Sequence, residues 1–143
     1  MGLDNAAVVM RRKRYSRGRT KWYAPPQTGT YTERKAHLHA PFAHLPRPFN
    51  DGGYLRGKGW AGLVYAASGH DLYRDLLTPL DAERIARGLR TFDWETYLAQ
   101  VLPRENGAER DERERLWRSE LIPGLTGYFQ TCADHTLGIV SWD

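Results

Sequence analysis

The sequence predicts an α+β fold, in which a small sheet formed by strands near both ends of the chain carries about three to four helices on one face. Three observations lead to this prediction. Runs rich in β-branched residues lie at 5–10 and 137–142, apolar residues recur at helical spacing between them, and 143 residues suffice for one domain with a real core. We therefore expect a single domain over residues 1–143.

The N-terminal third is predicted to hold one strand followed by a long basic segment. The apolar run at residues 5–10 indicates a buried strand. Residues 11–53 lack helical periodicity and contain five of the eight prolines. We expect loops there, with short strands only at 21–24 and 28–32, and a run of this length is commonly either functional or mobile.

Helices are predicted to fill the middle of the chain. Residues 58–68 place apolar side chains at helical spacing. Residues 79–90 follow Thr78, whose hydroxyl suits a helix N-terminus. A shorter helix is expected at 92–101, with Asp93 as its cap.

The last predicted elements are a charged helix and a strand. Residues 108–121 place an acid four positions before an arginine three times, a spacing typical of a solvent-exposed helix. We expect Pro123-Gly124 to end this helix. The strand at 137–142 is expected to pair with the strand at 5–10.

Composition excludes a wholly disordered chain, because 41% of the residues are hydrophobic and 12% are aromatic. The single cysteine, Cys132, cannot form an internal disulfide, and we expect it to be a buried thiol in a cytoplasmic protein. No signal peptide is expected at the N-terminus, and no apolar run approaches the roughly 20 residues that cross a bilayer, so no membrane partner is predicted.

The net charge of +4 conceals two halves of opposite sign. Residues 1–70 contain twelve Lys or Arg and three Asp or Glu, which gives +9, whereas residues 71–143 contain nine and fourteen, which gives −5. Two interpretations follow. The halves attract one another within the fold, or the basic half faces an external anion.

The strongest candidate site is the stretch RRKRYSRGRTKWY at 11–23, which has seven cations and no acid. Basic side chains interleaved with aromatic rings combine phosphate neutralisation with surfaces on which bases stack. The candidate stacking residues are Tyr15, Trp22 and Tyr23. The candidate phosphate contacts are Arg11, Arg12, Lys13, Arg14, Arg17, Arg19 and Lys21. The alternative is a solvated loop, or a loop held against the acidic helices.

Arg56 and Lys58 form a second anion-binding candidate. They flank Gly57 before the predicted helix at 58–68, where backbone N–H groups favour an anion. The stretch lacks the complete nucleotide-triphosphate loop pattern. The alternative is a glycine turn with two solvated cations.

Three histidines, His37, His39 and His44, are a candidate zinc site. Two imidazoles separated by one residue point the same way on a strand, and His44 would complete the nitrogen ligands. Ordinary loop histidines are the competing interpretation, and no cofactor is expected in that case.

Short islands resemble a group of small uncharacterised proteins of actinobacteria and their phages. They are MGLDN at the start, LRGK at 55–58, HDLY at 70–73 and LGIV at 137–140. The resemblance implies a bacterial or phage setting and no particular chemistry.

Three functions are therefore ranked. The first is a small accessory protein that binds nucleic acid or a nucleotide through its basic half. The second is an interaction module that contacts a host or virion protein, with Trp22, Tyr23, Tyr31 and Tyr54 as surface anchors. The third is a small metal-dependent enzyme that uses the three histidines.

Overall fold

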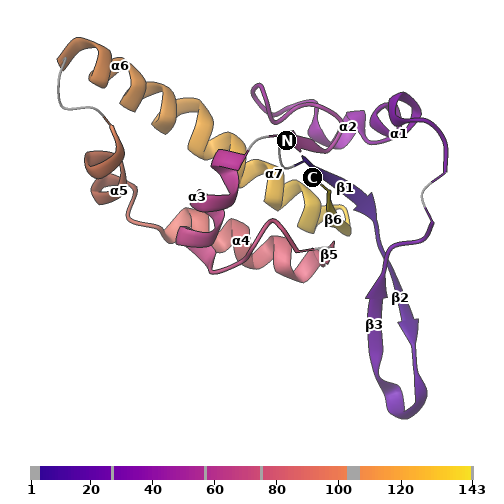
Figure 1. Cartoon of the computed structure of the whole chain (residues 1–143). Coiled ribbons are helices and arrows are strands. Elements are labelled where there is room, and N and C mark those ends of the chain that lie inside the picture. Colours follow the sequence, from indigo (N-terminus) through magenta and orange to yellow (C-terminus); the bar gives the residue numbers. More distant parts are fainter. Residues whose placement is uncertain (1–3, 27, 57, 75, 103–106, 143) are drawn as a thin grey trace.

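A four-stranded antiparallel sheet in the order β4-β1-β6-β5 organises the fold (Figure 1). In this computed structural model, β1 (Asp4–Val9) and β6 (Leu137–Trp142) pair along their whole lengths, so the predicted pairing of the two strands is confirmed. The edge strands β4 (Tyr54–Arg56) and β5 (Leu76–Leu77) are too short for a sequence pattern to indicate. The structure describes residues 4–26, 28–56, 58–74, 76–102 and 107–142, without the side chains of Lys58 and Trp142.

Both faces of β1 are covered. Ala7 on one face belongs to the main core together with its cross-strand partner Ile139. Ala6 and Val8 on the other face are also buried, at 5% and 4% exposure. A strand buried on both faces needs apolar residues at successive positions, and this explains the unbroken apolar run at 6–10.

The main core lies between the sheet and the helices α3 (Lys58–Ser68), α4 (Pro79–Thr91) and α7 (Ile122–Asp134). Helix α4 packs against α7, and both helices contact β6. The predicted α+β class, with helices against one face of a small sheet, is confirmed. Side chains with almost no exposure include Phe42, Phe49, Leu55, Ile85, Leu89, Tyr128, Phe129 and Cys132.

Helix α4 begins as predicted. The Thr78 hydroxyl accepts a hydrogen bond from the backbone N–H of Asp81 at 3.1 Å, and the Asp81 carboxylate accepts one from the backbone N–H of Thr78 at 2.9 Å. This reciprocal capping satisfies two backbone donors that have no partner inside the helix. Helix α5 (Trp94–Val101) also has a side-chain cap, since the Asp93 carboxylate accepts from the backbone N–H of Thr96 at 3.1 Å.

Pro123 and Gly124 do not end a helix, and this prediction is wrong. Helix α6 (Gly107–Leu116) continues through a π-helical turn at Trp117–Leu121 into α7. The backbone N–H of Ile122 bonds to the carbonyl of Trp117, five residues back. The wider π turn accommodates the proline, whose ring would otherwise crowd a carbonyl and which offers no donor.

A β-hairpin replaces the loop predicted for the most basic residues. Strand β2 (Arg11–Arg14) pairs with β3 (Thr20–Tyr23) in a separate two-stranded sheet. The strand predicted at 21–24 is thus confirmed with a shift of one residue, whereas β2 was not predicted. Its four consecutive cations carry no alternation of apolar and polar residues, so only pairing with β3 defines it as a strand.

The strand predicted at 28–32 is wrong, because α1 (Tyr31–His37) begins within that range. The Thr30 hydroxyl accepts a hydrogen bond from the backbone N–H of Glu33 at 3.2 Å, which is local capping chemistry for a helix. The four-residue helix α2 (His39–Phe42) follows it.

Candidate nucleic-acid interface

The β2–β3 hairpin projects as a ribbon from the body of the molecule (Figure 1). The chain passes from β1 through Met10 into the ribbon, so β2 continues the path of a buried strand. Across the ribbon, Arg12 pairs with Trp22 and Lys13 pairs with Lys21. The aromatic and β-branched residues of β3 favour an extended backbone, which supports this local structure.

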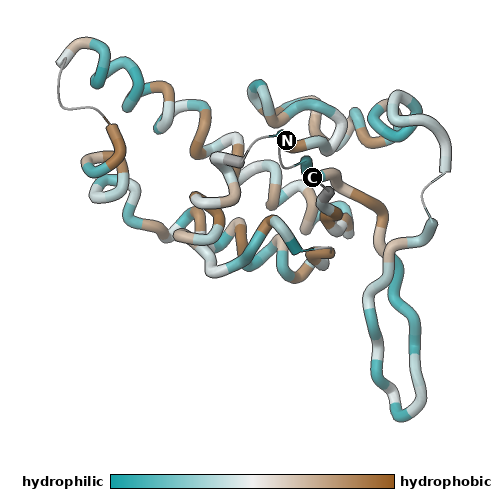
Figure 2. The backbone as a smooth tube through the Cα atoms, in the orientation of Figure 1, coloured by the Kyte–Doolittle hydropathy of each residue, from teal (hydrophilic) through white to brown (hydrophobic). Residues whose placement is uncertain are grey.

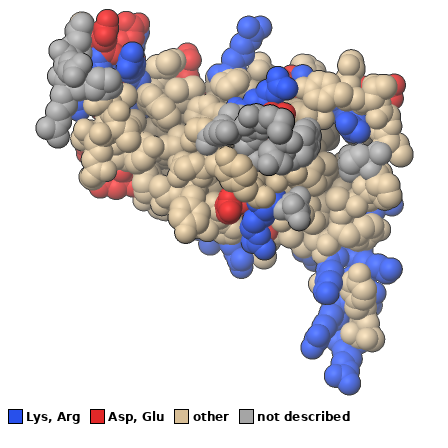
Figure 3. Space-filling view, in the orientation of Figure 1, with Lys and Arg blue, Asp and Glu red and all other residues tan. Residues whose placement is uncertain are grey.

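The ribbon presents positive charge without an internal counterion. All seven of its cations are exposed, and none has a carboxylate within ion-pair distance in the described part of the chain. Figure 2 shows the ribbon as a predominantly hydrophilic extension, and Figure 3 shows its surface in blue and tan with no red. The seven cations are Arg11, Arg12, Lys13, Arg14, Arg17, Arg19 and Lys21.

The tip of the ribbon holds an arginine in an unusual backbone conformation. The backbone N–H of Tyr15 donates to the carbonyl of Arg19 at 2.6 Å and closes the connecting loop. Within this loop Arg17 has φ +67° and Gly18 has φ +72°. A left-handed conformation is free for glycine but costs a larger residue about 1 kcal/mol or more. This backbone strain therefore lies at the tip of the ribbon, where the Arg17 side chain is exposed.

The ribbon's aromatic rings contact its own cations. The Arg12 guanidinium lies 4.4 Å from the centre of the half-buried Trp22 ring. The ammonium groups of Lys13 and Lys21 lie 5.7 and 5.6 Å from the centre of the Tyr15 ring. Cation–π attraction of this kind holds the Arg12, Lys13 and Lys21 side chains beside these rings.

The Arg56 candidate is separate from the ribbon. Its guanidinium lies 3.2 Å from the Asp4 carboxylate, at the opposite end of β1 from Arg11. A six-residue strand spans about 20 Å, so Arg56 does not belong to the same cationic cluster. The side chain of Lys58 lies outside what the structure describes. Arg56 therefore lies apart from the cationic cluster of the ribbon.

The three candidate zinc ligands are exposed and lie at helix ends. His37 ends α1, His39 begins α2, and His44 follows α2, so the strand geometry expected for the first two is wrong. Within the described residues, no three His, Cys, Asp or Glu side chains are grouped closely enough to hold a metal ion.

Tyr54 is not a surface anchor, because it is only 6% exposed. Its ring centre lies 4.4 Å from that of Tyr31, and the ammonium of Lys35 lies within 6 Å of both ring centres, at 4.9 and 5.6 Å. Lys35 also forms an ion pair with Asp51, and the hydrogen bond that its ammonium donates to this carboxylate raises the pKa of Lys35. These contacts join α1 to the start of β4. Of the four aromatic anchors predicted from the sequence, Tyr23 and Tyr31 remain well exposed.

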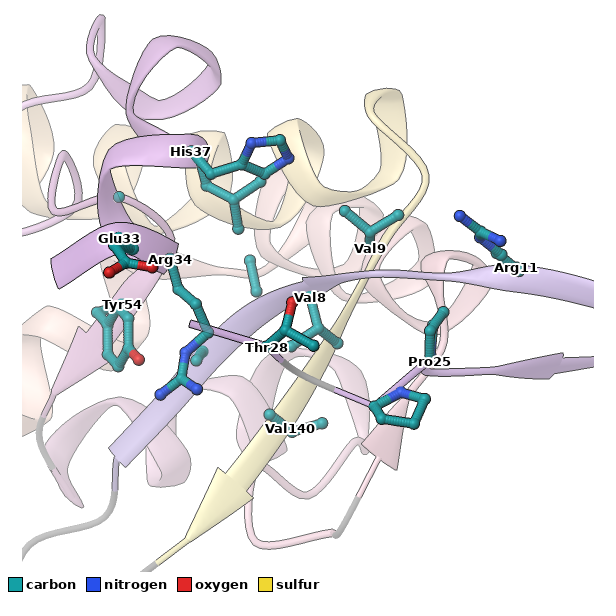
Figure 4. A pocket seen from close by; sticks show the side chains of 15 residues that line it. Val8, Val9, Arg11, Pro25, Thr28, Glu33, Arg34, His37, Tyr54 and Val140 are labelled. Atoms are coloured by element: carbon teal, nitrogen blue, oxygen red, sulfur yellow. The ribbon is translucent and has the colours of Figure 1, made fainter. Parts of the chain in front are cut away.

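A pocket of about 560 Å³ lies at the root of the ribbon, between α1 and the outer face of β1 (Figure 4). Val8 and Pro25 contribute apolar surface, while Arg11 and Arg34 bring positive charge to its edge. Arg34 is not among the candidates predicted from the sequence, because a strand was expected at 28–32 in place of the start of the helix that carries Arg34. The capping pattern Thr-x-x-Glu at 30–33 is the signal that would have indicated the helix carrying Arg34.

No family model, curated protein or solved structure matches this chain. The resemblance to small actinobacterial and phage proteins therefore stays a prediction. Among the residues described, no helix is long and apolar enough to cross a membrane.

Proposed function

We propose that this protein binds nucleic acid through the β2–β3 ribbon. One observation carries the proposal: seven exposed cations lie on a projecting arm where no carboxylate of the described residues neutralises them. Each phosphate neutralised by such a cation releases condensed counterions, which supplies binding free energy without any requirement for base sequence.

Within the described part of residues 71–143, no carboxylate forms an ion pair with these cations. Two carboxylates of α6 form local pairs with arginines, with Glu112 3.4 Å from Arg115 and Glu114 3.1 Å from Arg118. Figure 1 places α6 and the ribbon at opposite ends of the molecule. Attraction between exposed charges weakens beyond a Debye length of about 8 Å at physiological salt, so the ribbon remains available to an external polyanion.

We also propose that the protein is cytoplasmic, where a nucleic-acid partner is accessible. The single thiol, Cys132, is fully buried and needs no oxidising compartment.

The test is the salt dependence of binding to a fluorescent oligonucleotide, measured by anisotropy. Wild-type affinity should fall steeply with salt. A variant with Arg11, Arg12, Lys13 and Arg14 changed to Thr keeps β-forming residues in the ribbon and removes four charges. The slope of log K against log salt should become shallower by up to about 3.6 for a DNA duplex, which is 0.9 for each lost phosphate contact.

A matched variant controls for net charge. Replacing four exposed arginines outside the ribbon also removes four charges and should leave the slope close to that of the wild type; these are Arg84, Arg87, Arg113 and Arg115. Equal slopes for the ribbon variant and the control, or an absence of binding by the wild type at low salt, would overturn the proposal.

A further inference from the structure

We infer that the ribbon enters the major groove of double-stranded DNA and that Arg17 contacts a base there. This inference rests on the proposed function and names the form of nucleic acid that is bound. It differs from the stacking mode that the sequence suggests for a single strand.

Two of the three candidate stacking rings, Trp22 and Tyr15, are contacted by the ribbon's own cations, which argues against stacking of bases on them. A base that stacks on a protein needs an open ring face. The Trp22 ring is half-buried with the Arg12 guanidinium 4.4 Å from its centre, and both Lys13 and Lys21 approach the Tyr15 ring. These rings therefore orient cations.

The dimensions of the ribbon suit the major groove. That groove is about 12 Å wide and about 8.5 Å deep and admits a two-stranded ribbon, whereas the minor groove is only about 6 Å wide. Strands of four residues extend about 13 Å before the tip begins, which exceeds the depth of the groove.

Both faces of the ribbon carry positive charge. A ribbon inside a groove lies between two phosphate backbones, so each of its faces needs cations. Side chains alternate between the faces of a strand. Arg12 and Arg14 therefore share one face, while Lys13 and its cross-strand neighbour Lys21 share the other. Like charges directly opposite one another are unfavourable in the free ribbon. An anion close to that face relieves the repulsion between Lys13 and Lys21.

Arg17 is positioned to contact a base. It lies in the loop between β2 and β3, which is the distal end of the ribbon in Figure 1, and it is exposed with φ +67°. Guanine offers the O6 and N7 acceptors in the major groove, and arginine is the side chain that most often binds both. The arrangement therefore places phosphate contacts along the strands and a guanine contact at the tip.

The experiment compares a guanine-containing DNA duplex, its separate strands, and the same duplex with 7-deazaguanine, which lacks the N7 acceptor. By fluorescence anisotropy, wild-type protein should bind the duplex at least tenfold more tightly than either strand. The 7-deazaguanine duplex should bind at least fivefold more weakly. Netropsin, which occupies the minor groove, should leave the affinity unchanged.

The variant Arg17→Gly tests the tip, because glycine adopts the left-handed conformation without strain and preserves the loop. This variant should bind both duplexes with the same affinity. Arg84→Ala, which removes an exposed cation from α4, should retain the preference for the normal duplex. Circular dichroism of each variant checks that the fold is kept.

Tighter binding of the single strands, displacement by netropsin, or an undiminished guanine preference in Arg17→Gly would overturn the inference and leave the proposed function standing. A salt slope that does not depend on the ribbon cations would remove both.

Discussion

Replacing Gly124 by alanine tests the largest difference between the predicted and the observed fold. The sequence suggests that Pro123-Gly124 is a helix stop, where an extra methyl group would meet solvent. The structure instead buries Gly124 inside α7. A Cβ atom there would lie 2.3 and 2.6 Å from two ring carbons of Phe49 and 2.9 Å from Pro46.

The size of the effect follows from these distances. Carbon atoms pack favourably at about 3.5–4.0 Å, so the Phe49 ring must move by about 1 Å. It has little room, since it is fully buried and its ring centre lies 5.2 Å from that of Trp60. Overpacking of this kind costs about 1–3 kcal/mol, which the greater helix propensity of alanine offsets by about 0.5–1 kcal/mol. We expect a net loss of about 1–2 kcal/mol.

Urea denaturation followed by circular dichroism measures this loss. The matched control is Gly62→Ala in α3, where the new methyl group meets no atom within 4 Å, and stability should rise by about 0.5–1 kcal/mol. Phe49→Leu in the Gly124→Ala background should restore part of the loss, because a smaller side chain leaves space for the methyl group. A Gly124→Ala protein as stable as the wild type would refute the packing described here.

Two further predictions concern the core and a helix cap. Burial raises the pKa of the Cys132 thiol well above its ordinary range, so native protein at pH 8 should resist iodoacetamide until urea unfolds it, and prompt alkylation would contradict this. Because the native thiol keeps its proton while the unfolded thiol ionises near pH 8.5, this group's contribution to stability should be lost as the pH rises above about 8.5. Thr78→Ala should lower the free energy of unfolding by about 1 kcal/mol in urea denaturation, since it removes the cap of α4, and an unchanged midpoint would argue against the cap.

The positive charge of the candidate site could be predicted from the sequence, but the arrangement of its residues in space could not. The absence of acids between residues 11 and 23 is visible without a structure. The separation of Arg56 from this cluster is not, because it depends on how β4 aligns with β1 and brings Asp4 beside Arg56. The contact between the Arg12 guanidinium and the Trp22 ring likewise depends on which residues pair across the hairpin.

The amino-acid sequence alone determined those structural features that depend only on residues close together in the chain. The caps of α4 and α5, the apolar strand at 5–10 and the charge of the ribbon each arise within a few positions of one another. Tertiary structure decided the rest. The helix passes through Pro123 by a π turn, and Phe49 packs on Gly124 from 75 positions away in the chain, so no local pattern could indicate either the turn or the contact.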